Sequence, residues 1–121
     1  MADMESILSS IRKMLGPEDT YTYFDSDIIM HINSALADLG SIGVGPEEGF
    51  EIEDESTTWE EFFGEFPNPK LLNNVKQYVY LSVKLIFDPP TNSTVLNSYE
   101  TKLSKLEWKI NALVDPGPKE V

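Results

Sequence analysis

Cysteine is absent from this chain of 121 residues, and histidine occurs only once. The missing cysteine excludes disulfide bonds and thiol chemistry. The sequence also lacks a glycine-rich phosphate loop, an HExxH metal motif and a nucleophile elbow. The single histidine, His31, lies near the side of an apolar helical face without a partner pattern, which is typical of a structural residue. We therefore expect a protein that is not an enzyme and that uses no cofactor or metal.

Long hydrophobic runs are missing too. No stretch approaches the roughly 20 apolar residues of a membrane span, so we expect no membrane partner. The N-terminal segment is amphipathic and does not have the basic start and apolar run of a secretion signal, which predicts synthesis in a cytoplasm. The length predicts one domain, residues 1–114, followed by a tail of residues 115–121, where two prolines and a glycine disfavour helix.

Basic residues are absent from the middle of the chain, whose formal net charge is -12. Between Met14 and Phe66 there are 14 acidic residues and no lysine or arginine, whereas residues 67–121 contain 7 lysines and 5 acidic residues. This distribution argues against a nucleic-acid-binding groove, which needs a basic footprint. An acidic surface could line a passage through which DNA slides, could mimic DNA, or could simply be a solvated loop that aids solubility.

Apolar residues recur at helical spacing in four stretches, which predicts an all-α fold, a small bundle of about four helices. The first two helices are expected at about Asp3–Leu15 and from a cap at Asp25 to about Leu39. The last two form a hairpin, with one helix over Leu71–Phe87 and the other reaching about Asn111. Between them, Pro89-Pro90 stops the first helix, because neither proline can donate a backbone hydrogen bond.

The last helix has a regular apolar seam with alternating steps of three and four residues, which predicts lengthwise packing against other helices. The seam consists of Leu96, Tyr99, Leu103, Leu106, Ile110 and Leu113. Three lysines, Lys102, Lys105 and Lys109, lie on one flank of it. Trp108 points away from the seam, so it either lies under a loop of its own subunit or anchors a subunit contact. The preceding helix has a narrow polar strip that consists of Lys70, Asn73, Asn74, Gln77 and Lys84. Leu81 falls within this strip, which favours a covering partner.

An acidic extended arm or short hairpin is predicted between the second and third helices. Phe50 and Ile52 alternate with acidic residues, as in a short strand or an extended arm. Thr58 and Glu61 have the spacing of a capping box, which predicts a turn of helix with its aromatic residues facing inward. A connection of this length is unusual in a compact domain and is typically functional. The acidic residues of the arm are Glu47, Glu48, Glu51, Glu53, Asp54 and Glu55.

Five strings carry a resemblance to a known family: Tyr78–Pro90, Ser98–Glu100, Leu106–Asn111, Gly43–Pro46 and Thr58–Phe62. Together they resemble the head–tail connector proteins (adaptor or head-completion proteins) of long-tailed bacteriophages. The resemblance extends over Ile7–Asn111 and concerns overall pattern rather than a chemical motif.

The resemblance implies a helical bundle whose copies assemble as a ring of twelve subunits beneath the portal. Such a ring prolongs the DNA channel and joins head to tail, which places the protein in the neck of the virion after assembly in the host cytoplasm. The implied partners are other copies of the chain, the portal protein and a downstream neck or tail protein. Double-stranded DNA passes through without specific binding.

Ring closure needs one contact patch on each side of a subunit, and our candidates are Trp59, Phe62, Leu81 and Trp108. By the same resemblance, the tail docks onto the portal through Asp115, Pro116, Gly117, Pro118, Lys119, Glu120 and Val121. The acidic region, Glu47–Glu65, would face the channel lumen or a neighbouring subunit.

Two other functions remain open at this point. The first is an acidic DNA-mimic inhibitor of a host DNA-binding protein, which predicts a basic partner and binding that weakens with salt. The second is a regulatory helical module, which predicts a compact monomer.

Overall fold

The computed structural model describes residues 5–16, 24–46, 48–64, 67–87 and 89–114, and these contain five helices and no strand. The helices are α1 (Ile7–Leu15), α2 (Asp25–Ser41), α3 (Trp59–Phe63), α4 (Pro69–Phe87) and α5 (Ser93–Val114). The predicted all-α bundle is confirmed, with α3 as a short fifth helix within the acidic connection. Within the described residues, no helix combines the length and the hydrophobicity that a membrane span needs.

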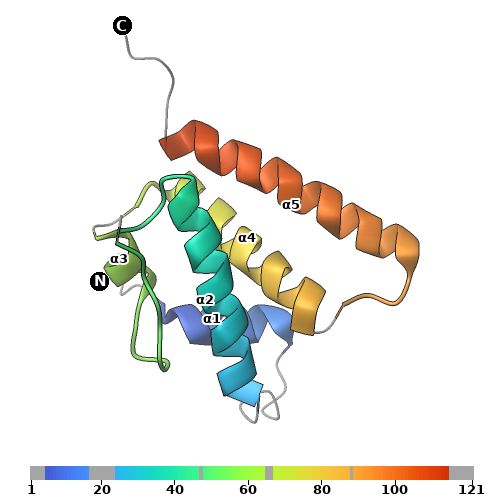
Figure 1. Ribbon diagram of the computed structural model, residues 1–121, viewed down its shortest axis with the longest axis horizontal. Coiled ribbons are helices and arrows are strands. Elements are labelled where there is room, and N and C mark those ends of the chain that lie inside the picture. The colour runs from blue at the N-terminus through green and yellow to red at the C-terminus, as the bar shows by residue number, and fades with distance from the viewer. Residues whose placement is uncertain (1–4, 17–23, 47, 65–66, 88, 115–121) are drawn as a thin grey trace, which may run out of the picture.

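Helix α4 is the centre of the bundle. It packs against α2 and α1 on one side and against α5 on the other (Figure 1). Val75, Val79 and Val83 are completely buried along it. Leu81 was expected to face a partner, but its side chain is only 4% exposed within the subunit. A helix covered from several directions buries residues all round its circumference, so periodicity alone misplaced Leu81.

The ends of the hairpin helices have identifiable caps. Asn92 caps α5, because its Oδ1 accepts from the backbone N–H groups of Thr94 (2.8 Å) and Val95 (3.1 Å). At α4, Asn68 Oδ1 accepts from Lys70 N (2.7 Å), and Pro69 takes the first helical position, where its missing N–H costs nothing. Helix α4 therefore begins two residues before the predicted start.

The first two helices begin differently from the prediction. Helix α1 begins at Ile7 rather than near Asp3, because Ser6 is its N-cap and accepts from Ser9 N at 3.1 Å. Helix α2 begins at Asp25 itself; its N-cap is Phe24, which makes no side-chain capping bond. At the other end of the chain, α5 continues to Val114, three residues beyond the predicted end.

Helix α3 fastens the acidic connection to α1. The predicted capping box is present: Thr58 Oγ1 accepts from Glu61 N (3.2 Å), and Glu61 Oε1 accepts from Thr58 N (2.9 Å). Trp59 is fully buried, and its Nε1 donates to Ser10 Oγ on α1 at 2.8 Å. A backbone hydrogen bond from Ile7 N to the carbonyl oxygen of Thr57 (2.9 Å) joins the two segments as well.

Candidate functional site

The acidic segment, residues 48–55, forms neither helix nor strand. Its centre is Ile52, which is 2% exposed and is held by Asn33 of α2. The backbone N–H of Ile52 donates to Asn33 Oδ1 at 2.8 Å, and Asn33 Nδ2 donates to the Ile52 carbonyl at 3.1 Å. Because neighbouring side chains in extended backbone point to opposite sides, the inward Ile52 leaves Glu51 and Glu53 exposed.

The far end of the acidic segment is tied to α1 and α2 through Arg12. One guanidinium nitrogen of Arg12 donates to both carboxylate oxygens of Asp25, at 3.0 and 2.9 Å, and the other donates to Glu55 at 3.1 Å. Burial lowers the pKa of Arg12, but the hydrogen bonds to Asp25 and Glu55 outweigh it and raise that pKa overall. The segment is thus held at both its centre and its end.

Not every acidic residue of the segment has such a partner. Asp54 accepts from the hydroxyl and the N–H of Ser56, and these hydrogen bonds lower its pKa. In the described part of the chain, Glu48, Glu51 and Glu53 are exposed and form no ion pair. Glu47 lies outside the described residues.

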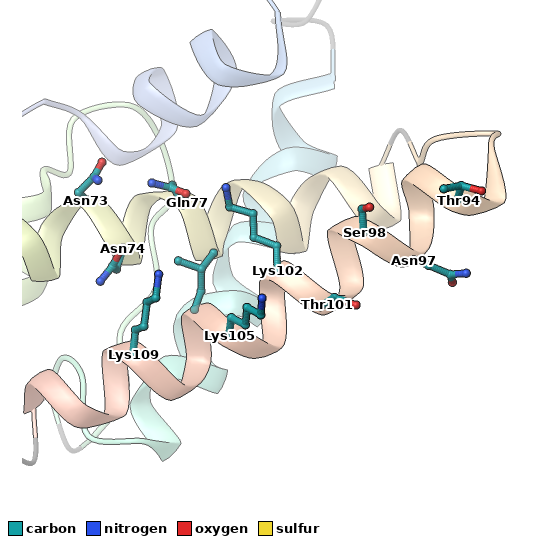
Figure 2. Close-up of a pocket in the computed structure, with 11 residues that line it drawn as sticks. Asn73, Asn74, Gln77, Thr94, Asn97, Ser98, Thr101, Lys102, Lys105 and Lys109 are labelled. Carbon is teal, nitrogen blue, oxygen red and sulfur yellow. The ribbon is translucent and has the colours of Figure 1, made fainter.

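A polar, basic groove of about 900 Å³ runs between α4 and α5. Lys102, Lys105 and Lys109 project from successive turns of α5, and α4 contributes amide side chains opposite them (Figure 2). Among the described residues, no acidic side chain lines this α4–α5 groove, and its three lysines form no ion pair. The lining consists of Asn73, Asn74, Gln77, Thr94, Asn97, Ser98, Thr101, Lys102, Lys105, Leu106 and Lys109.

Sequence reasoning had found the lysine row but not the groove. The helical spacing put the three lysines on one flank of the apolar seam. The facing amides, Asn73, Asn74 and Gln77, were recognised only as a polar strip on α4. The lysine row and the polar strip face each other only because of how the two helices of the hairpin pack. The periodicity within each helix gives no information about this packing.

The four predicted interface residues separate into two groups. Trp108 is 73% exposed on α5 and is the most exposed large hydrophobic side chain in the described part of the chain. Trp59, Phe62 and Leu81 are buried in the core of a single subunit, so in this conformation they offer no surface to a neighbour. We therefore carry only Trp108 forward as a subunit contact.

Tyr78 links the two helices of the hairpin from inside. Its hydroxyl lies 3.5 Å from Glu107 Oε2, at the long limit of a hydrogen bond. Burial, with the nearby negative charges of Glu107 and Asp38, raises the pKa of Tyr78 to about 12. The tyrosine is therefore neutral at physiological pH and acts as a hydrogen-bond donor between α4 and α5.

Two other predictions concern a metal site and the C-terminal tail. Among the described residues, no group of three or more histidine or acidic side chains is arranged to hold a metal ion. The proposed portal-docking residues, 115–121, lie outside the described residues, so their role stays a prediction.

Comparison with known proteins identifies the family. Residues 7–117 match the family model described as phage connector protein, which covers nearly the whole chain. No curated protein and no solved structure is similar enough to count as a match. The matched range includes all five helices, the acidic segment and the α4–α5 groove. The chain therefore belongs to the phage connector protein family, as the resemblance in its sequence had indicated.

Proposed function

We propose that this connector is a subunit of a ring of about twelve copies in the neck of a phage particle. The ring lies below the portal, extends the DNA channel and joins head to tail. The observation that carries the proposal, beyond family membership, is the exposure of Trp108 on a helix whose other side is packed into the bundle.

Trp108 is suited to a contact between subunits. Leu106 and Ile110 of α5 are buried against α4, whereas Trp108 lies between them in sequence and is 73% exposed. Tryptophan is enriched among the residues that contribute most to binding, because its large side chain loses much apolar surface to water when a partner covers it. A second subunit seated on α5 would cover it.

The charge of the molecule is compatible with a channel through which DNA moves. A formal net charge of -12 repels the phosphate backbone, so DNA would pass without specific binding. In this arrangement residues 115–121 dock onto the portal, and the opposite end of the ring receives the next neck or tail protein. The DNA-mimic alternative is supported by the acidic charge alone, whereas the family match favours the connector.

The test is the composition of phage particles made without this protein. In a host that produces every other phage component, we expect DNA-filled heads and free tails that fail to join, counted by electron microscopy. Supplying the wild-type chain from a plasmid should restore joined particles. Complete, infectious, tailed particles in the absence of the chain would contradict the proposal.

A further inference from the structure

We propose that the α4–α5 groove of one subunit binds the acidic segment of a neighbouring copy of the same chain. This inference rests on the proposed ring and specifies one of its subunit contacts. It assigns a role to two charged surfaces that the single subunit leaves unpaired.

Both surfaces lack partners within the described residues of their own chain. The three lysines of the groove, Lys102, Lys105 and Lys109, form no ion pair. Three glutamates of the acidic segment, Glu48, Glu51 and Glu53, form no ion pair either. The two surfaces also lie apart on the bundle: in Figure 1 the acidic segment is beside α3 at the left, whereas α5 runs along the top. They are therefore placed to pair between subunits rather than within one.

The spacing of the charges is compatible with such pairing. Glu51 and Glu53 lie two residues apart in an extended segment, a separation of about 6.6 Å along the backbone. Lys105 and Lys109 lie four residues apart on a helix, a rise of about 6 Å. The two carboxylates can thus face two ammonium groups on successive turns of α5. The amides of Asn73, Asn74 and Gln77, on the facing helix, supply further N–H donors for carboxylate oxygens.

The acidic segment is also preorganised for binding. Asn33 fixes the backbone of Ile52, and Arg12 holds Glu55, so little further ordering is needed when Glu51 and Glu53 meet a partner. Exposed ion pairs are individually weak, so the contact depends on several pairs together and should weaken as ionic strength rises.

The geometry of the contact leads to a ring or a filament. The groove and the acidic segment are different patches, so each bound pair of subunits still has one free groove and one free segment. Such a head-to-tail contact can repeat until the ring closes. An isologous dimer would instead use one self-complementary patch and stop at two copies.

Charge reversal tests the contact. We expect Lys105→Glu with Lys109→Glu, or Glu51→Lys with Glu53→Lys, to weaken self-association about tenfold or more, because like charges then meet. All four changes in one chain restore the net charge of -12 and should restore association. Asp38→Lys with Glu100→Lys is the control for the second pair, since it changes the charge equally at exposed residues outside both patches. Sedimentation of each variant, alone and with the portal of the same phage, is the measurement.

Cross-linking locates the contact directly and detects weak association. Because the chain has no cysteine, Glu53→Cys and Lys105→Cys each introduce a single thiol. A bis-maleimide linker is preferable to a disulfide, because a disulfide requires Cα atoms only about 4.4–6.8 Å apart. A mixture of the two variants should give a cross-linked dimer in clear excess over a mixture of Asp38→Cys with Lys105→Cys.

The outcomes separate this inference from the proposed function. Excess cross-linking together with recovery in the fourfold variant supports the inference. Cross-linking at the control level, both with and without portal, overturns it, as do reversal variants that assemble like the wild type. If rings form or bind portal in those cases, the connector function stands and only this contact is wrong.

Discussion

Gly45 shows how a single residue ties the acidic connection to the core. Its φ is +89°, a left-handed conformation that glycine adopts without strain. A Cβ atom at this position would lie 2.4 Å from Cε1 of Phe62, which is buried beneath it. The backbone approaches the ring this closely because there is no side chain between them. Gly45 thus sets the path of the backbone between α2 and the acidic segment.

Replacing Gly45 by alanine should destabilise the fold through both effects. The left-handed conformation costs an alanine about 1–2 kcal/mol, and overpacking against Phe62 adds about 1–3 kcal/mol. Gly49→Ala is the matched control, because Gly49 also has a positive φ (+101°) but has open space at its Cβ position. Urea unfolding should give the larger loss for Gly45→Ala. Equal losses for the two variants would show that the contact with Phe62 contributes nothing.

The raised pKa of Tyr78 predicts a loss of stability at alkaline pH. An unfolded tyrosine titrates near pH 10, whereas the pKa of Tyr78 is raised to about 12 by burial and by the neighbouring carboxylates. Because the fold favours the neutral form, this contribution is fully present below about pH 10 and is lost as pH rises toward 12. The free energy of unfolding should fall more steeply over this interval in the wild type than in Tyr78→Phe. Parallel pH profiles for the two proteins would contradict the assignment.

At the scale of elements, much of the fold could be predicted because it depends on local sequence patterns. The apolar spacing of α1, α2, α4 and α5 and the Thr58–Glu61 capping box are each confined to short stretches. The signal for the start of α4, Asn68 followed by Pro69, was also readable, although the prediction began at Leu71. The burial of Leu81 was not readable, because it depends on how many helices surround α4.

The acidic segment illustrates the same limit. Its alternating pattern around Ile52 predicted an extended conformation, but the partner that holds it, Asn33, lies 19 residues earlier in the chain. Sequence spacing does not reveal such a long-range side-chain-to-backbone pairing. The α4–α5 groove, likewise, exists only after two helices have packed.

Asn33→Ala should release the acidic segment from α2. The change leaves both the N–H and the carbonyl of Ile52 without their partner, at a cost of about 1–2 kcal/mol for partly buried groups. We expect lower stability in urea and faster hydrogen exchange at the Ile52 amide. Asn111→Ala, at an exposed position on α5, should change the stability by no more than about 0.5 kcal/mol. Unchanged exchange at Ile52 would contradict the role of Asn33.

At the scale of the whole molecule, the two tryptophans lie in opposite environments. Trp59 is fully buried at the junction of α3 and α1, whereas Trp108 is 73% exposed on α5. We therefore expect stability to depend on Trp59 and subunit assembly to depend on Trp108. This difference follows from packing, because charged and apolar residues flank both tryptophans in the sequence.

Substituting each tryptophan by alanine should separate folding from assembly. Trp59→Ala should lower the free energy of unfolding by about 3–5 kcal/mol, because it leaves a large cavity and removes the hydrogen bond that Trp59 Nε1 donates to Ser10 Oγ. Trp108→Ala should change that free energy by no more than about 0.5 kcal/mol but should weaken subunit association by about 2 kcal/mol or more. Urea unfolding and sedimentation equilibrium measure the two quantities. Wild-type association in Trp108→Ala would remove this residue from the interface.

The central claim, that this phage connector works as a ring at the portal, is tested most directly by its mass in solution. The purified protein would be weighed by native mass spectrometry, first alone and then mixed with the portal protein of the same phage. We predict a ring-sized oligomer of the 13.7 kDa chain or a stable complex containing many copies on one portal. A protein that stays monomeric and does not bind the portal would contradict the account.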